Sequence, residues 1–419
     1  MEKKYYLSFL VVLLIANVLF AQNFTYSSIK IENVSFTGAS LTIQKDDGTG
    51  SYIAPQWTSQ AAIQSPVAYV SGLAPKVKAS FTFKCDNSTP PTFVYIRGKA
   101  SDSIDFPSTK VDLVASGGNA FTFKYPETDG SLIFKPEIVR FFNPFIISWE
   151  VSFDKGTNWN IIGETKNTLY VTYKTPQAET TEFKWFHTVF DLSCRNAKQL
   201  NTEKTIIAGI WNEFTDQIVL NYNGDSLFYY KKINITNQTL ALLLKYKDAQ
   251  CYTFAQLFLG AIKIQGIVRT NNYVYIAGKS KSACGGNIDR MLVNKWRFGT
   301  PTGSGSCSAF PYKMVYNLSN LKTSGTAYKF ISTDIKDEVG TPGSCTKNPA
   351  SFFANHQIAL VDGIYYDASY GLSFPNLTEL RDKEIAAWGI GTYQGVDQVT
   401  AYFTTDLTKT EMGESITTY

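Results

Sequence analysis

The chain has 419 residues, of which 44% are apolar, 15% aromatic and only 18% charged, so it has enough apolar surface to bury a large core. This composition excludes a disordered polymer, and the length indicates two or three domains. Thirty-nine Lys and Arg against 35 Asp and Glu leave a formal charge of +4 without any run of like charge. That pattern excludes a nucleic-acid-binding surface.

The first 21 residues have the three parts of a secretory signal peptide. A charged end, Glu2-Lys3-Lys4, precedes an apolar stretch from Tyr5 to Phe20, and Ala21 is a small residue at the expected cleavage point. The alternative is an uncleaved membrane anchor, but the apolar stretch is short for a span of about 20 residues. We therefore predict export to the periplasm, the cell surface or the medium, with no membrane span in the mature chain.

Residues 22–174 are predicted to form an all-β domain. Short alternating runs such as SIKIENVSF, KASFTFK, TFVYIRG and SWEVSF are separated by turn signals such as DDGTG and DKG. About seven strands without a helix between them favour an immunoglobulin-like sandwich, although the Cys and Trp pattern of antibody domains is missing. The Pro-containing polar stretch at 175–182 is predicted to be a linker.

Residues 183–419 change to a mixed pattern. Apolar residues from Lys198 to Leu220 recur at helical spacing, 238–246 is predicted to be a second helix, and CYTFAQLFLGAIKIQGI is predicted to be a third. Strand-like runs such as YVYIAG follow, and this order of helices before a sheet predicts an α+β domain. His187 lies earlier, in the strand-like run EFKWFHTVF, and is expected to be structural.

The six cysteines are expected in an oxidising compartment, where thiols usually pair. Cys284, Cys307 and Cys345 lie in Gly- and Ser-rich loops, and we expect at least two of them to pair with each other. No CxxC is present and neither His lies near a pair of Cys in the sequence, so no metal site is predicted. Gly-rich phosphate loops and acidic calcium loops are also missing, and no cofactor is predicted.

Cys251 differs from the other cysteines because it begins a predicted helix. A thiol in the first turn faces unpaired backbone N–H groups and the positive end of the helix dipole, which favour the nucleophilic thiolate. Asp248, three residues earlier, is predicted to cap that helix. The alternative is that Cys251 is a small buried hydrophobe, a common fate of an unpaired cysteine.

The segment HQIALVDGIYYDAS predicts a β-hairpin with a two-residue Asp362-Gly363 turn. That turn pairs Val361 with Ile364 and Leu360 with Tyr365, and it places His356 and Asp367 on one face as diagonal neighbours. Such a carboxylate can orient the imidazole and stabilise its charged form, as the third member of a catalytic triad does. The alternative is a half-buried histidine at a sheet edge.

The segment TLALLLKYKDAQCYTFAQLFLGAIKIQGIVRT resembles the nucleophile helix of the transglutaminase-like superfamily, which has a papain-like Cys-His-Asp site. The motif C-x-x-F-A-x-L-x-x-x-x-x-R-x-x-G-I is matched at Cys251, Phe254, Ala255, Leu257, Gly266 and Ile267, with Lys263 in place of Arg. NHQIALVDGIYYDASYG is similar to the His and Asp segment in order and in its hairpin. It lacks the Trp and Glu after the His and has Ala368-Ser369 in place of Pro-Thr. The likeness covers residues 238–371.

The resemblance implies that Cys251 is the nucleophile, His356 the general base and Asp367 the residue that orients it. The implied activity is that of an exported amide hydrolase or acyltransferase acting on peptide or protein substrates through a thioester. The backbone N–H of Cys251 is one expected oxyanion donor, while Trp211, Asn212 and Gln250 remain open for the second. The alternative is a non-catalytic surface binding or adhesion protein with a degenerate transglutaminase-like domain.

Overall fold

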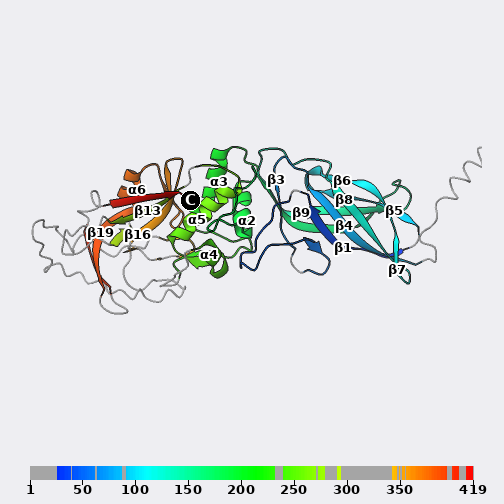
Figure 1. Ribbon diagram of the computed structural model, residues 1–419, viewed down its shortest axis with the longest axis horizontal. Helices are drawn as coiled ribbons and strands as arrows, with labels where there is room; N and C mark the ends of the chain where they lie inside the picture. Colours follow the sequence, from blue (N-terminus) through cyan, green and yellow to red (C-terminus); the bar gives the residue numbers. More distant parts are fainter. Residues whose placement is uncertain are drawn as a thin grey trace, which may run out of the picture. The chain divides into compact units, whose positions relative to one another are not determined.

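The computed structural model forms two compact units, which are described separately (Figure 1). Unit 1 comprises 1–42, 52–136 and 141–171, and unit 2 comprises 43–51, 137–140 and 172–419. The residues that the structure describes are 26–38, 40–61, 64–86, 91–231, 239–269, 272–278, 290–293, 342–346, 349, 352–353, 355–393, 399–404 and 412–418. The expected signal peptide at 1–21, Cys284 and Cys307 lie outside them.

Unit 1 contains two five-stranded sheets. The first has the spatial order β2 (Trp57–Thr58), β1 (Tyr26–Thr37), β4 (Lys76–Cys85), β8 (Ala120–Asp129) and β7 (Val114–Gly117). The second has the order β3 (Val67–Val70), β10 (Asn160–Thr172), β9 (Arg140–Ser152), β5 (Phe93–Ala100) and β6 (Asp105–Asp112). A single 3₁₀ turn, η1 (Ser101–Ser103), is the one helical element among its described residues. The expectation of an all-β region holds there, with ten strands where about seven were expected.

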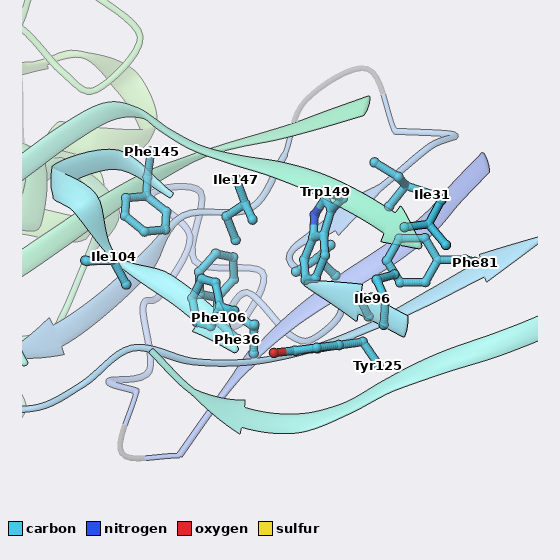
Figure 2. Packing of buried hydrophobic residues seen from close by; sticks show 14 of the residues in the cluster. Ile31, Phe36, Phe81, Ile96, Ile104, Phe106, Tyr125, Phe145, Ile147 and Trp149 are labelled. Atoms are coloured by element: carbon cyan, nitrogen blue, oxygen red, sulfur yellow. The ribbon is translucent and has the colours of Figure 1, made fainter. Parts of the chain in front are cut away.

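The core of unit 1 lies between the two sheets and is rich in aromatic side chains (Figure 2). Trp149 of β9 is fully buried, and its ring contacts Phe81 of β4 and Tyr125 of β8 edge to face, each at 5.4 Å between centroids. Its indole N–H donates to the Thr165 hydroxyl at 3.2 Å, which satisfies the ring's one polar group. Because β4 and β8 belong to the first sheet and β9 to the second, this cluster joins the sheets.

Unit 2 has five helices in the described part of the chain. They are α2 (His187–Asn196), α3 (Glu203–Thr215), α4 (Leu240–Tyr246), α5 (Cys251–Ile264) and α6 (Leu377–Glu384). Helix α5 packs against α2, α3 and α4, and also against strands β16 and β17. Every residue of α5 except Tyr252 is buried, so this helix forms the centre of unit 2. Figure 1 shows α5 among α2, α3 and α4, next to the sheet that contains β13 and β16.

The strands of unit 2 form two larger sheets and one short pair. The antiparallel five-stranded sheet has the order β18 (Leu372–Phe374), β17 (Ile364–Asp367), β16 (Asn355–Val361), β13 (Asn272–Gly278) and β21 (Met412–Thr418). The four-stranded sheet is β15 (Phe352–Phe353), β14 (Arg290–Val293), β19 (Ile385–Tyr393) and β20 (Val399–Thr404). Strands β11 (Phe228–Tyr229) and β12 (Asp248–Ala249) pair in parallel. The fold class is therefore α+β, as predicted.

Several local predictions were wrong. His187 begins helix α2 instead of lying in a strand, and its buried ring stacks on Tyr222 at 3.7 Å between centroids. Asp248 does not cap α5, because it lies in β12 and accepts a hydrogen bond from the Lys231 N–H. The expected linker belongs to unit 2, where the N–H of Gln177 donates to the carbonyl of Lys263.

None of the helices within the described ranges is long and apolar enough to cross a membrane.

Candidate active site

A hairpin brings His356 and Asp367 together. The turn residues Asp362 and Gly363 have φ angles of 52° and 81°, the left-handed conformation that a two-residue hairpin turn requires. Val361 pairs with Ile364 and Leu360 pairs with Tyr365, as the sequence predicts. Nε2 of His356 lies 2.6 Å from Oδ2 of Asp367, and both side chains are fully buried. The predicted contact between these residues is confirmed, whereas the half-exposed sheet-edge histidine was the wrong alternative.

The start of α5 positions Cys251. The helix begins at Cys251 itself, and Gln250 is the N-cap residue without a side-chain capping bond. Cys251 is 6% exposed, and Phe254, one turn further along the same face, contacts the Tyr229 ring edge to face. The thiol therefore lies at the N-terminal end of a buried helix, where the unpaired backbone N–H groups are found. It carries no disulfide, as expected.

The charges around His356 favour its protonated form. Burial by itself lowers the pKa of His356, but the Asp367 carboxylate and the Cys251 sulfur outweigh that effect and raise the pKa well above its ordinary value. Because an ionised carboxylate can only accept a hydrogen bond, Nε2 of His356 carries a proton and donates it in the bond to Asp367. In the neutral ring, the lone pair is then on Nδ1, for which no well-formed hydrogen bond is found among the described residues. The thiol of Cys251 interacts with the same ring.

Asp367 is held in its ionised form by donors on both oxygens. Oδ2 accepts from His356, and Oδ1 accepts from the backbone N–H of Ser369 at 2.9 Å. Burial opposes ionisation, but these contacts, together with a hydrogen bond to the side chain of Glu384, hold the pKa of Asp367 below its ordinary value. The carboxylate is thus oriented by its surroundings as well as by the imidazole.

Glu384 is a member of this cluster that sequence reasoning missed. It is the last residue of α6, is 1% exposed, and has its Oε1 at 3.8 Å from Nε2 of His356. Burial and the neighbouring Asp367 raise the pKa of Glu384 well above its ordinary value. The available signal was Asn376, whose side chain caps α6 by accepting from the Glu379 N–H. That capping pattern predicts a helix ending near Glu384, but nothing local predicts its contact with the hairpin.

Two tyrosines also lie beside this cluster. Tyr229 and Tyr370 are fully buried, their rings meet edge to face at 5.2 Å, and Tyr370 also contacts the imidazole of His356 at 5.8 Å. Burial raises the pKa of both hydroxyls well above the ordinary value, so both stay neutral. Tyr229 also contacts Phe254, which lies one turn along α5 from Cys251.

The three residues suggested as the second oxyanion donor lie in different parts of unit 2. Trp211 packs against Phe214, Phe258 and Tyr366 as a core residue. Asn212 lies on α3, where its carbonyl accepts from the Thr215 hydroxyl. Only Gln250 adjoins Cys251, as the residue that precedes it.

The donor set of His356, Asp367 and Glu384 also resembles a metal site, because one ligand atom of each lies within 4.8 Å of the other two. Bonds of about 2.0–2.2 Å to a shared ion keep adjacent ligand atoms about 3 Å apart. The 2.6 Å separation of Nε2 and Oδ2 is shorter than that and fits a shared proton. The arrangement therefore favours a hydrogen-bonded network over a metal centre.

The remaining residues singled out in the sequence lie apart from this cluster. Burial lowers the pKa of His187 to about 3, so this histidine is neutral and structural, as expected. Cys345 carries no disulfide, and its thiol approaches the carbonyl of Val219 at 3.8 Å. A pairing of Cys284 with Cys307 lies outside the described residues.

The chain matches no model of a known protein family, and no curated protein is similar to it in sequence. The likeness to the transglutaminase-like superfamily therefore rests on the motif residues alone.

Proposed function

We propose that the protein is a cysteine-dependent amide hydrolase or acyltransferase of the transglutaminase-like type, with Cys251, His356 and Asp367 as its catalytic residues. The observation that carries the proposal is the 2.6 Å contact between His356 and Asp367 beside the thiol at the start of α5. His356 lies 105 positions after that thiol in sequence and interacts with it, in the order that the motif implies. A fully buried imidazole and carboxylate of this kind are costly unless they are paired.

The chemistry follows from the protonation states. Nδ1 of His356 accepts the proton of the Cys251 thiol, and the thiolate sulfur attacks the carbonyl carbon of a peptide or isopeptide bond. The imidazolium then gives that proton to the leaving nitrogen as the C–N bond breaks and a thioester remains. Water, or a second amine, loses a proton to Nδ1 and attacks the thioester. The C–S bond breaks, the product acid or amide is released, and the imidazolium returns its proton to the sulfur, which restores the thiol.

The developing oxyanion requires donors that are already in place. The backbone N–H of Cys251 is one of them, because the first N–H groups of a helix have no partner within the helix. The Asp367 carboxylate stabilises the imidazolium that forms in each half of the cycle.

The proposal extends to the chain as a whole. The two sheets of unit 1 around the Trp149 core support an immunoglobulin-like sandwich, and unit 2 supports a papain-like domain. The sequence of residues 1–21 supports export, and peptide or protein substrates outside the cytoplasm fit both features.

The test is Cys251→Ala, assayed with a peptide library in parallel with the wild type. We expect loss of amide cleavage and amine transfer, together with a change in unfolding free energy of about 1 kcal/mol, because one sulfur is removed. Cys345→Ala is the matched control, since it removes a thiol apart from the cluster. Wild-type turnover by Cys251→Ala, or a large loss of stability as its main effect, would assign Cys251 to the core instead.

A second function, a non-catalytic binding protein, is favoured by the burial of the cluster, because Cys251 is 6% exposed and His356 is fully buried. Iodoacetamide distinguishes the two. A thiolate paired with His356 is alkylated at one stoichiometric site near neutral pH, and the reaction slows in His356→Gln. A binding protein with an inert thiol shows neither behaviour.

A further inference from the structure

The carboxyl group of Glu384 is buried among acceptors. Among the described residues no donor hydrogen-bonds to Oε1 or Oε2, whereas each oxygen of the adjacent Asp367 has one. An ionised carboxylate in that position would have a large desolvation cost, which the His356 imidazolium at 3.8 Å offsets only in part because no donor hydrogen-bonds to either oxygen. A protonated carboxyl is different, because its O–H can donate to Asp367.

The net charge of the whole cluster also favours a protonated Glu384. The titratable groups that face Glu384 in the described part of the chain are Asp367, His356, Cys251 and Tyr370. If Asp367, Glu384 and Cys251 were all ionised against one imidazolium, the buried cluster would have a net charge of −2. Retaining one proton on Glu384 reduces that to −1, or to zero with the thiol. The proton belongs on Glu384 because Asp367 already has donors on both oxygens.

We propose that Glu384 is a positioning residue of this site, whose protonated carboxyl donates a hydrogen bond to Asp367 and holds that carboxylate against Nε2 of His356. Asp367 then accepts from an imidazole, a backbone N–H and a carboxyl group, which together restrict its rotation. The consequence for catalysis rests on the proposed function, whereas the hydrogen-bond network does not. Glu384 acts through Asp367 and contacts neither the thiol nor a substrate atom in this assignment.

The chain has only two histidines, which makes imidazole NMR a direct test on the full-length protein. His187 stays neutral across the working pH range, so the titrating ¹⁵N signals belong to His356. The variants are Glu384→Gln, which retains a donor of similar size without a charge, and Glu384→Ala, which removes the donor. Glu379→Gln is the control, because Glu379 lies on the same helix and is half-buried, with Lys383 as its ion-pair partner.

We expect Glu384→Gln and Glu379→Gln to leave the titration of His356 unchanged. If Glu384 were ionised, its neutralisation at 3.8 Å from Nε2 would lower the His356 midpoint by about one pH unit or more, and that result would overturn the proposal. In Glu384→Ala we expect the Nε2 proton to exchange with water at least about tenfold faster, because Asp367 is no longer held. Unchanged exchange in Glu384→Ala would assign Glu384 to packing alone.

Turnover provides the separate test of the catalytic consequence. Glu384→Gln should retain kcat, whereas Glu384→Ala should lower kcat with little change in KM. If the NMR results hold while neither the wild type nor any variant cleaves or transfers an amide, the network is correct and the proposed function is wrong. If the NMR results fail while the wild type is active, the positioning role is wrong and the function remains.

Discussion

Replacing Asp367 with Asn should destabilise unit 2 by about 3 kcal/mol. Asp367 accepts from Nε2 of His356 and from the Ser369 N–H, and its carboxyl group also pairs with Glu384. Asn has only one acceptor oxygen, so its NH₂ group must face one of these donors and leave it unsatisfied, at a cost of about 1–3 kcal/mol. The bond that remains to His356 is neutral instead of charge-assisted, which removes about 1 kcal/mol more.

The effect should depend on pH with a definite sign. The pKa of Asp367 is lowered to about 2 in the folded state, so its contribution is complete above the unfolded pKa of about 3.9 and is lost as the pH falls through 2. The pKa of His356 is raised, so its contribution is complete below the unfolded pKa of about 6.5 and is lost as the pH rises through the folded value. The difference between wild type and variant is therefore largest between about pH 5 and 6.

Urea unfolding at pH 5.5, followed by helical circular dichroism, provides the assay, because all α-helices among the described residues belong to unit 2. Asp362→Asn is the matched control on the same hairpin. Asp362 forms an exposed ion pair with Arg269, which contributes about 0–1 kcal/mol, and Asn tolerates its φ of 52°. Equal losses of unfolding free energy in the two variants would refute this prediction. So would a loss in Asp367→Asn that does not become smaller between pH 4 and pH 2.

Two further predictions use the same unfolding assay. Because burial lowers the pKa of His187 to about 3, the unfolded chain binds a proton that the folded chain excludes as the pH falls below about 6.5. His187 should therefore cost unit 2 about 2 kcal/mol between pH 7 and pH 5, and His187→Phe should make the protein more stable at pH 5, relative to pH 7, by about that amount compared with the wild type. Gly371→Ala should lower the unfolding free energy by about 3 kcal/mol, because Gly371 has a φ of 68° and a Cβ would collide with the carbonyl oxygen of Phe214. Gly363→Ala should lower it by about 1 kcal/mol, because Gly363 has a φ of 81° but open space around it. Equal midpoints for the two glycine variants, or the same acid sensitivity in wild type and His187→Phe, would contradict these assignments.

The parts of the site that were predictable from sequence are those set by short-range rules. The Asp362-Gly363 turn determines the register of its hairpin, and the period of two then places His356 beside Asp367. Apolar spacing likewise predicts a helix starting at Cys251, and the structure starts α5 there. Both predictions need only the geometry of one element and its nearest neighbour.

The parts that failed depend on contacts between distant segments. The run EFKWFHTVF is rich in aromatic and β-branched residues, which favour a strand. The structure instead begins helix α2 at His187, whose ring packs on Tyr222. Asp248 has the residue type of a cap, but the backbone N–H of Lys231 is its hydrogen-bond donor. Glu384 ends a polar helix, and its role is visible only once that helix lies beside the hairpin. Propensity and spacing contain no information about such partners.

The energetic cost of burying the thiol, imidazole and carboxyl groups of the cluster raises the question of why the chain contains them. Cys251, His356, Asp367 and Glu384 are all at most 6% exposed, and buried charges are rarely more stabilising than apolar side chains of similar volume. The cost of burying them is offset by the apolar packing of α5 and its neighbours, which does not depend on a thiol, an imidazole or two carboxyl groups. Stability alone therefore gives little reason for this set of side chains. A hydrogen-bonded series from one carboxyl group through a second to an imidazole beside a thiol is instead what the nucleophile role that we propose for Cys251 requires.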